Sequence, residues 1–341
     1  MKLVDVHVEP FTPRNASAPD LISCHRLMEA WWRRDKPDLP PLAYDDAVGR
    51  LQLPFPGFGE VIHRVARRGG EIVGLATVYL LQDDSSHIAL TEIVVHPRER
   101  RHGIGTAMLR ALLPELRERG REVVEGWQLT VGGDGPEWAG SLGFRTVHTV
   151  LMQTLEIPEA DSSLWNVDVP AGYRTQRWIG AAPDDLVTSY AEARQSIHDA
   201  PLGDLGYQEP QWTVERVREH EAELEALGVD HRVVVVVHEA TGLVAGLTEL
   251  EVHPNDLNWG YQRDTAVVPA HRGRGLGRCV KAEMIRWLLA DRPRFQRIQT
   301  TTGAENTHMS RVNHQLGFVT ARTMVAVNAE IGDLEERLAP P

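Results

Sequence analysis

The sequence predicts an α+β protein made of two similar domains in tandem, each a mixed, mostly antiparallel sheet flanked by helices. Its length of 341 residues suits two domains of about 150–200 residues better than one. A strand-to-helix stretch recurs 172 residues further on, and a Leu-Gly-Phe recurs 174 residues further on. The matched pairs are Val95 and Val267, Pro97 and Pro269, Arg100 and Arg272, Gly103 and Gly275, Gly105 and Gly277, and, in the Leu-Gly-Phe, Gly143 and Gly317. A period this long indicates duplication of a whole domain, since solenoid repeats have periods of about 20–50 residues.

The elements of both halves follow from hydrophobic periodicity. In the first half, strands are expected at 2–9, 61–67, 72–81 and 88–95, and helices at 21–32 and 106–118. In the second half, strands are expected at 232–238, 243–251, 259–268 and 297–302, with a helix after the Gly-rich stretch and another at 306–316. The boundary is expected in the Pro-, Ser- and Asp-rich linker 157–172, which gives domains 1–156 and 173–341.

Composition argues against several classes of protein. The net charge of −12 argues against a general nucleic-acid binder, whose affinity depends on neutralising phosphates, and is compatible with a cationic small substrate. The longest apolar runs, such as the valines at 233–237, are far shorter than the roughly 20 residues that cross a bilayer. Two cysteines provide neither a disulfide framework nor a zinc-ligand spacing, so no metal and a cytoplasmic location are expected.

The two Gly-rich stretches lie where a strand is followed by a helix. The first N–H groups of such a helix have no partner within it, and the helix dipole adds about half a positive charge there. Glycines let a ligand approach this backbone, so each stretch predicts a phosphate site. The spacing excludes two commoner sites, because there is no G-x-x-x-x-G-K-[ST], and residues 273–277 run G-x-G-x-G rather than G-x-G-x-x-G.

These stretches resemble the signature of the GNAT superfamily of acyl-CoA-dependent N-acyltransferases, [QR]-x-x-G-x-[GA] after a strand that ends in V-x-P. It is present as R-R-H-G-I-G at 100–105 after V-H-P, and as R-G-R-G-L-G at 272–277 after V-V-P. The resemblance implies two tandem GNAT domains whose loop amides hold the pyrophosphate of acetyl-CoA, with the pantetheine arm between two splayed strands. The residues that it places at the cofactor are Val95, Arg100, Arg101, His102, Gly103, Ile104, Gly105 and Thr106 in the first half, and Val267, Arg272, Gly273, Arg274, Gly275, Leu276, Gly277, Arg278, Asn306 and Asn313 in the second.

One position departs from the family pattern. A tyrosine four residues before the glycine of the Leu-Gly-Phe often protonates the leaving thiolate in this family, and here Ala139 and Asn313 stand there. The source of that proton therefore stays open, and Asn313 is left as a hydrogen-bond partner of pantetheine or substrate. Asn306, in the later family segment at 300–318, is the expected cofactor contact.

Acyl transfer to an amine needs a base, because most amines are protonated at neutral pH. Glu92 and Asp264 hold the same strand position in the two halves, three residues before the repeated valine, and both are candidates. Glu249 and Glu251 alternate on a neighbouring strand and therefore share a face, so either could act as base or bind a cationic substrate. Asp199, Asp204, Tyr207 and Trp212, in the loop before the second domain's sheet, could bracket a cationic amine or pack the domains together.

The sequence thus predicts an acetyl-CoA-dependent N-acetyltransferase that acts on a small-molecule amine by direct attack in a ternary complex. Catalysis is expected in the second half, because the first half has no asparagine that corresponds to Asn306. Two alternatives stay open: a non-catalytic, regulatory acyl-CoA-binding protein and a protein lysine acetyltransferase. No nucleic acid and no membrane are expected as partners, and the chain is expected to be a monomer or a homodimer.

Overall fold

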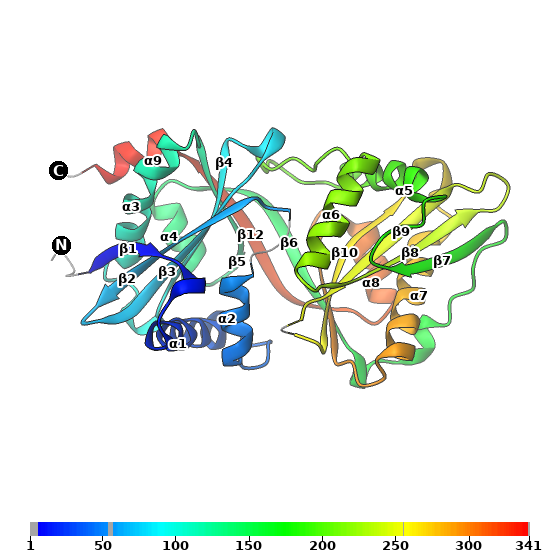
Figure 1. Cartoon of the computed structure of the whole chain (residues 1–341), viewed down its shortest axis with the longest axis horizontal. Coiled ribbons are helices and arrows are strands. Elements are labelled where there is room, and N and C mark those ends of the chain that lie inside the picture. The colour runs from blue at the N-terminus through cyan, green and yellow to red at the C-terminus, as the bar shows by residue number, and fades with distance from the viewer. Residues whose placement is uncertain (1–5, 54–56, 255, 340–341) are drawn as a thin grey trace. The chain divides into compact units, whose positions relative to one another are not determined.

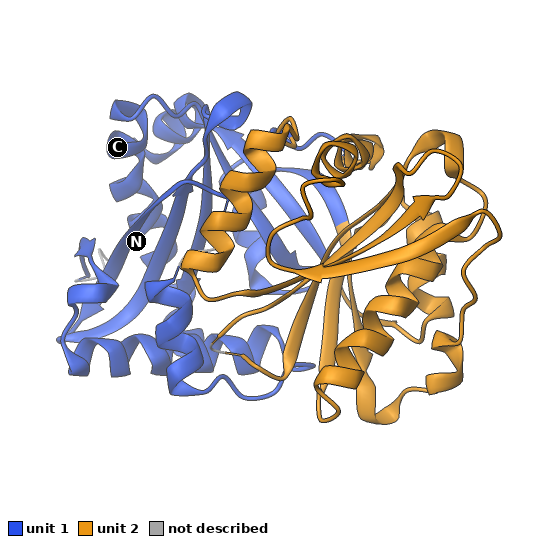
Figure 2. Cartoon of the chain, turned by 45° about the vertical axis from the view of Figure 1, so that its right-hand side comes forward, with its two compact units in different colours: residues 1–149, 203–208, 324–341 blue, residues 150–202, 209–323 orange. Residues whose placement is uncertain are grey.

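The computed structural model describes residues 6–53, 57–254 and 256–339. By contacts the chain divides into two compact units (Figure 2): unit 1 contains residues 1–149, 203–208 and 324–341, and unit 2 contains residues 150–202 and 209–323. Part of the strand expected at 2–9 lies outside the described residues, and the described strand β1 begins at His7. No helix within the described ranges is long and apolar enough to cross a membrane.

The sheet of unit 1 has the strand order β1-β2-β3-β4-β5-β12. Its strands are β1 (His7–Phe11), β2 (Glu60–Arg68), β3 (Glu71–Leu80), β4 (Ile88–Val95), β5 (Val123–Thr130) and β12 (Val319–Glu330). Among the described residues of this sheet, β4 and β5 are parallel and the other neighbouring pairs are antiparallel. The last strand of the chain thus completes the sheet of the first unit beside β5 (Figure 1).

Helices cover both faces of this sheet. The helices α1 (Ala18–Asp35) and α2 (Tyr44–Gln52) bury apolar residues on one face, where Cys24, Leu27 and Ala47 are fully buried. The helices α3 (Ile104–Glu118) and α9 (Ile331–Leu338) bury theirs on the other face, and α4 (Asp134–Ser141) follows β5. The alternation of side chains along β2, β3 and β4 supplies both cores.

Unit 2 has the same plan, with the strand order β6-β11-β10-β9-β8-β7. Its strands are β6 (Arg145–Glu156), β7 (Tyr173–Ile179), β8 (Asp230–His238), β9 (Val244–Val252), β10 (Trp259–Val267) and β11 (Arg297–Gly303). The helices α5 (Val187–Arg194) and α6 (Val214–Ala226) cover one face, and α7 (Leu276–Asp291) and α8 (Thr307–Gln315) belong to the other side. Here β6, from the first half of the sequence, pairs with β11. The structure therefore confirms two tandem domains with mixed sheets flanked by helices.

The two parallel pairs separate after a few residues. The last paired residues are Leu90 and Glu125 for β4 and β5, and Tyr261 and Gln299 for β10 and β11. Beyond these positions each strand continues without its neighbour, and the first strand of each pair leads into a Gly-rich loop and a helix. Each unit thus contains a V-shaped gap with a helix N-terminus at its mouth.

Candidate functional site

The two Gly-rich loops have the same backbone conformation. Gly103 and Gly275 precede their helices with φ of +81° and +76°, in the left-handed region that glycine adopts without strain. Arg100 Nε donates to the carbonyl of Val95 at 3.3 Å, and Arg272 Nε donates to the carbonyl of Val267 at 3.0 Å. Both arginines predicted at the cofactor therefore also fasten the loop to the end of its strand.

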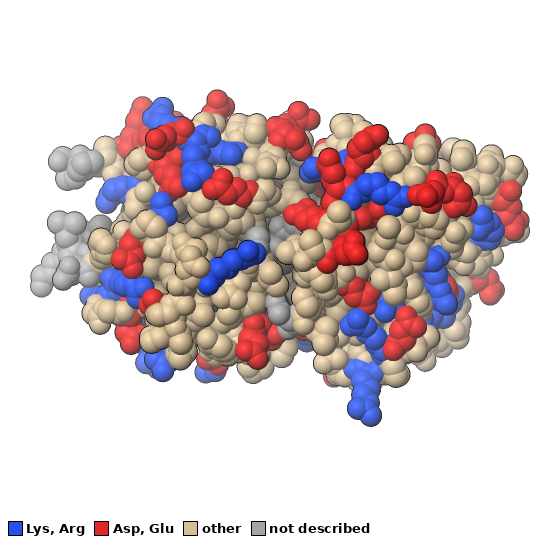
Figure 3. Space-filling model, viewed as in Figure 1, with Lys and Arg blue, Asp and Glu red and all other residues tan. Residues whose placement is uncertain are grey.

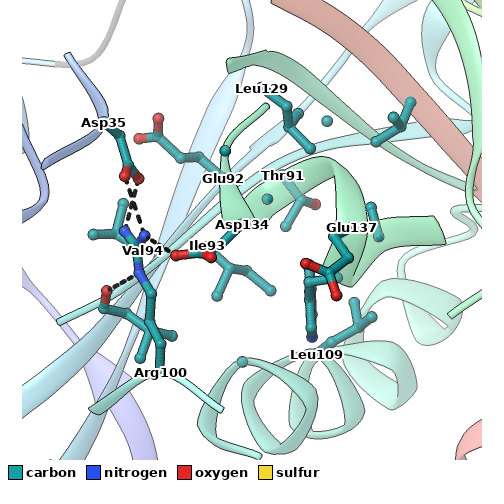
Figure 4. Close-up of a pocket in the computed structure, with 18 of the residues that line it drawn as sticks. Asp35, Thr91, Glu92, Ile93, Val94, Arg100, Leu109, Leu129, Asp134 and Glu137 are labelled. Carbon is teal, nitrogen blue, oxygen red and sulfur yellow. Dashed lines mark hydrogen bonds and ion pairs between the residues drawn. The ribbon is translucent and has the colours of Figure 1, made fainter. Parts of the chain in front are cut away.

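Unit 1 contains a cavity of about 370 Å³ in its V-shaped gap (Figure 4). Its wall is mostly apolar, and its mouth carries loop residues of the first motif, including Arg100, Arg101, Gly103, Gly105 and Thr106. The apolar part of the wall includes Leu109, Val124, Leu129, Trp138, Phe144 and Val327. The dimensions suit an extended small ligand.

Carboxylates surround the loop of unit 1 (Figure 4). Arg100 forms ion pairs with Asp35 and Asp134, each at 2.7 Å, and Arg101 forms one with Glu137 at 3.2 Å. The hydrogen bond from Arg100 lowers the pKa of Asp134, so this carboxylate is ionised at neutral pH. A pyrophosphate at this loop would meet these anions, which weakens the electrostatic attraction of the helix N-terminus.

The loop of unit 2 is more open and more basic. Gly273 and Gly275 both have φ of +76° and nothing within 4 Å of an added Cβ atom, whereas Arg101, the counterpart of Gly273, holds the left-handed conformation at φ +64°. Arg274 is exposed, and Arg278 lies in the first turn of α7. When the two halves are aligned on their Leu-Gly-Phe sequences, Asp134 and Glu137 of unit 1 correspond to His308 and Arg311 of unit 2. The second loop therefore lacks the two carboxylates of α4 that flank the first, and its own ion pair is that of Arg272 with Asp199.

A buried ion-pair network lies near the end of the gap in unit 2. Arg194 Nε lies 3.1 Å from Glu249 Oε1, and the phenol of Tyr190 donates to the same carboxylate at 2.6 Å. His231 Nε2 lies 3.5 Å from the other oxygen of Glu249. Burial alone would raise the pKa of Glu249, but the Arg194 charge and His231 hold it well below its usual range. Glu249 thus anchors Arg194 and cannot accept a proton at neutral pH.

Glu251 is also held ionised. Its side chain is buried, with Arg263 at 3.3 Å and His253 at 3.2 Å. These partners overcome the effect of burial and lower the pKa of Glu251 to about 2. The two acids of β9 share a face, as the sequence indicates, and each is neutralised by its own cations.

Asp264 has the environment of a base. A register shift between Gln262 and Thr265 forms a bulge in β10, and Arg194 reaches the Asp264 carboxylate at 3.5 Å. Burial, together with the nearby charge of Glu249, raises the pKa of Asp264 against the pull of Arg194. The counterpart Glu92 lies on a regular stretch of β4, is exposed and lines the cavity of unit 1.

The four residues predicted to bind substrate are divided between the two units. Asp199 forms an ion pair with Arg272 of the second loop, and Trp212 is buried with its ring 3.2 Å from the guanidinium carbon of Arg194. Asp204 and Tyr207 belong to unit 1, where the Asp204 amide donates to the carbonyl of Val147 and the Tyr207 ring meets Trp127. Trp212 therefore already holds a cation of the protein itself.

The two asparagines of the later segment have different roles. Asn306 is the N-cap of α8, and its side chain accepts a hydrogen bond from the Met309 amide at 3.0 Å. Asn313 is fully buried, and its Nδ2 donates to Gln153 at 2.7 Å and to Thr302 at 3.2 Å. Within the described ranges, no group of three or more His, Cys, Asp or Glu side chains is arranged to hold a metal ion.

Five residues of these networks were not predicted from the sequence: Arg194, Tyr190, His231, Gln153 and Lys281. The first four carry no local signal, because their partners come from distant segments. Lys281 could have been found, since it is one of three lysines in the chain and lies among apolar residues of the helix after the second loop.

Two sheets with diverging strand pairs, each opening at a Gly-rich loop and a helix N-terminus, define a tandem acyl-CoA-dependent acyltransferase. The chain belongs to the acetyltransferase (GNAT) family, whose model matches residues 21–132 and 195–318. The predicted family and the prediction of an N-acetyltransferase are thereby confirmed.

Relatives and solved structures agree with this assignment. The chain is 28% identical over 292 residues to the mycothiol acetyltransferase of Kineococcus radiotolerans, covering 82% of this chain and 84% of that protein. It is 26% identical over 246 residues to the mycothiol acetyltransferase of Mycobacterium avium, covering 68% and 71%. A tandem GNAT protein from the clavulanic acid biosynthesis pathway has the same fold, with a TM-score of 0.77 at 24% identity over 96% of this chain and 99% of that one.

Proposed function

We propose that unit 2 transfers the acetyl group of acetyl-CoA to the amine of a small molecule, by direct attack of the amine on the thioester in a ternary complex. The observation that carries this proposal is the difference in charge between the two loops. A pyrophosphate would meet Arg274, Arg278 and the helix N-terminus in unit 2, but would meet Asp134 and Glu137 in unit 1.

In this proposal the loop amides and Arg278 hold the pyrophosphate, and the gap between β10 and β11 receives the pantetheine arm. Acetyl-CoA supplies the activated acyl group. Asp264 takes the proton of the attacking amine, because its raised pKa brings a carboxylate closer to neutral pH than an ordinary aspartate. Arg194, fixed by Glu249 and Trp212, orients the Asp264 carboxylate.

A cationic, small acceptor is supported by two observations. Figure 3 shows acidic side chains gathered over α6, whose exposed acids are Glu215, Glu219, Glu223 and Glu225. Such a surface raises the local concentration of an amine that is protonated in solution. The mycothiol acetyltransferases among the relatives are named for a small-molecule acceptor, and we extend that class of acceptor to this chain.

The test is calorimetric binding of acetyl-CoA to the wild type and to Gly275→Asp and Gly103→Asp variants. An aspartate at Gly275 should abolish binding, whereas Gly103→Asp should leave it within about twofold. Gly242→Asp is the matched control for backbone strain, since Gly242 has φ of +72° and open space around it in a turn outside the loops. If Gly275→Asp binds like the wild type, unit 2 is not the cofactor site and the proposal fails.

The cavity of unit 1 favours a second candidate, in which unit 1 binds acyl-CoA without transferring its acyl group. The acids at its mouth argue for weaker pyrophosphate binding there. A loss of binding confined to Gly103→Asp would select this candidate.

A further inference from the structure

Lys281 is a buried lysine in the helix that follows the second Gly-rich loop. Its side chain is 1% exposed, and its Nζ lies 5.2 Å from the centre of the Phe318 ring. No ion pair with Lys281 is present among the described residues. Burial lowers the pKa of Lys281 to about 7. Burying an amine without a carboxylate is costly, so its presence calls for an explanation beyond packing.

The duplication shows where this amine lies. With the 172-residue offset, Lys281 corresponds to Leu109, which lines the cavity of unit 1. Phe318 corresponds to Phe144, which lines the same cavity. By this correspondence we expect Lys281 to face the gap in unit 2 that the proposed function assigns to the acyl donor.

Two further apolar positions of the unit 1 cavity become polar in unit 2. Ala139 is replaced by Asn313 in the Leu-Gly-Phe register. The second position follows from strand pairing. In unit 1, Gly126 is the first residue of β5 after its parallel pairing with β4, and it pairs with Val327. In unit 2, Thr300 is the first residue of β11 after its parallel pairing with β10, and it pairs with Gln153. Gln153 is thus the counterpart of Val327.

These side chains leave hydrogen-bonding capacity for a ligand. Asn313 Nδ2 donates to Gln153 and Thr302, but the fully buried Asn313 Oδ1 has no hydrogen-bond partner within the described part of the chain. Gln153 Nε2 lies 3.2 Å from Ser310 Oγ and 3.1 Å from His314 Nε2. A buried amine and a buried, unpartnered amide oxygen, both at positions that line the cavity in unit 1, favour a ligand with a polar group at the corresponding place in unit 2.

We propose that Lys281 is the proton donor of the reaction in unit 2. As the amine forms its bond to the carbonyl carbon and the bond from that carbon to sulfur breaks, the electron pair goes to sulfur. The Lys281 ammonium gives the sulfur one proton, leaving a thiol and a neutral amine. Water returns a proton to Lys281, and Asp264 releases the proton of the attacking amine to water. This assignment rests on the proposed function, and it fills the role for which neither half has a tyrosine at the expected position.

The elements packed against α7 carry several titratable side chains, but none of them is a cause of the shift in the Lys281 pKa. The titratable side chains of the elements packed against α7 are Asp230, His231, Arg232 and His238 on β8, Glu249 and Glu251 on β9, Tyr261, Arg263 and Asp264 on β10, and His308, Arg311 and His314 on α8. Burial is the cause of the shift in the Lys281 pKa, so the charge of the amine is set by desolvation rather than by a fixed partner. A developing thiolate would supply the missing anion and favour the ammonium form.

The test measures binding rather than turnover. Coenzyme A and desulfo-coenzyme A are titrated into the wild type, Lys281→Leu and Gly275→Asp between pH 6 and 9, and the ultraviolet absorption of the bound thiolate gives the thiol pKa. In the wild type the bound thiol should ionise at lower pH than free coenzyme A, and above that pH coenzyme A should bind about 10- to 100-fold more tightly than its desulfo analogue. Lys281→Leu, which restores the residue of unit 1, should lose both effects and bind the desulfo analogue as the wild type does.

Two other results overturn the assignment in different ways. If Lys281→Leu keeps the wild-type thiol pKa while Gly275→Asp abolishes binding, Lys281 is not the proton donor and the proposed function stands. If Gly275→Asp binds coenzyme A like the wild type, the gap of unit 2 does not hold the donor and both proposals fail. Thermal unfolding of Lys281→Leu checks that the variant is folded.

Discussion

Arg194 contacts two carboxylates whose pKa values are shifted in opposite directions, down for Glu249 and up for Asp264. It is 3% exposed, lies 3.1 Å from Glu249 and 3.5 Å from Asp264, and rests on the Trp212 ring. Glu249 also accepts a hydrogen bond from Tyr190 and lies 3.5 Å from His231 Nε2, so it keeps its charge and pushes the pKa of Asp264 upward. Two acids whose environments separate their pKa values in this way are typical of catalytic sites.

Asp264→Asn should therefore lower kcat/KM for the acceptor amine by about 10²–10⁴-fold, since it removes the base. A base works only when deprotonated, so the wild-type rate should fall as pH decreases through a pKa above that of an ordinary aspartate. That limb should be absent in the variant. Stopped assays of free-thiol release across pH measure both.

The control is Glu92→Gln, the same change of charge at the exposed counterpart in unit 1, which should leave activity unchanged.

Glu249→Gln tests the structural role of the neighbouring carboxylate, which we expect to affect the free energy of unfolding. It leaves Arg194 poorly compensated in the interior and should lower the free energy of unfolding by about 3–5 kcal/mol. A wild-type rate in Asp264→Asn would exclude this residue as the base.

Lys281 gives a second prediction, on stability. Its pKa is about 7 in the folded protein and 10.5 ordinarily, so between these values the unfolded chain binds a proton that the folded chain has released. The cost of burying this amine is complete below pH 7, decreases as pH rises, and is absent above pH 10.5. Lys281→Leu should be more stable than the wild type at pH 7, by at least about 2 °C in Tm, and this advantage should shrink toward pH 10.

Differential scanning fluorimetry at pH 7 and pH 9.5 measures that difference. Val280→Ala, next to Lys281 in the same helix, is the control for general repacking; it changes no titratable group, so its effect on stability should be the same at both pH values. An advantage of Lys281→Leu that does not change with pH would show that shape rather than charge is responsible.

At the scale of elements, the sequence was informative where an amphipathic pattern and its packing partner lie close together. The predicted helices at 21–32 and 106–118 correspond to α1 and α3, and the predicted strands at 72–81, 88–95 and 232–238 correspond to β3, β4 and β8. The strands β5, β6 and β12 were not predicted; β6 and β12 pair with strands from the other half of the sequence, and β5 pairs with β4 over three residues only before it pairs with β12. The bulge in β10 also has no sequence signal, although it accompanies the contact between Asp264 and Arg194.

In the candidate site, too, the features that depend on neighbouring residues could be predicted and those that depend on distant residues could not. The Gly-rich loops could be located because glycine at a left-handed position before a helix is a local requirement. The partners of Glu249 and Glu251 could not, because the pairing of Glu249 with Arg194, 55 residues away, and of Glu251 with Arg263 on the next strand follows from tertiary packing. Composition likewise could not show that the loops differ in charge, because Asp134 and His308 come from the helices that follow β5 and β11.

The helix α9 is an element that unit 1 needs although it comes last in the chain. Ile331, Leu334 and Leu338 are buried in the same core as α3. Leu334→Ala should lower the free energy of unfolding of unit 1 by about 2–5 kcal/mol, because it leaves a cavity beneath α3. Gly332→Ala is the control in the same helix: an added Cβ meets nothing within 4 Å, so this change should be neutral or slightly stabilising. Urea unfolding measures both, and a neutral Leu334→Ala would mean that α9 does not support this core.

At the scale of the whole molecule, duplication has been followed by an exchange of strands. Unit 1 uses β12 and α9 from the end of the chain, and unit 2 uses most of β6 from the first half. Each sheet would otherwise end at β5 or β11, whose unpaired edge would expose backbone donors and acceptors. We therefore expect the two halves of the sequence not to fold independently.

This exchange predicts the behaviour of fragments cut at the composition-based boundary. Residues 1–156 lack β12 and α9, and residues 157–341 lack β6, so each fragment alone should lose a cooperative unfolding transition and tend to aggregate. Expressed together, the two fragments should copurify, since each contains the strand that completes the other's sheet. When the fragment 157–341 carries Leu334→Asp, less of the complex should be recovered, because the substitution places a charge in the core beneath α3. A fragment 1–156 that unfolds cooperatively on its own would show that β5 tolerates an open edge, and the exchange would then be dispensable for the stability of unit 1.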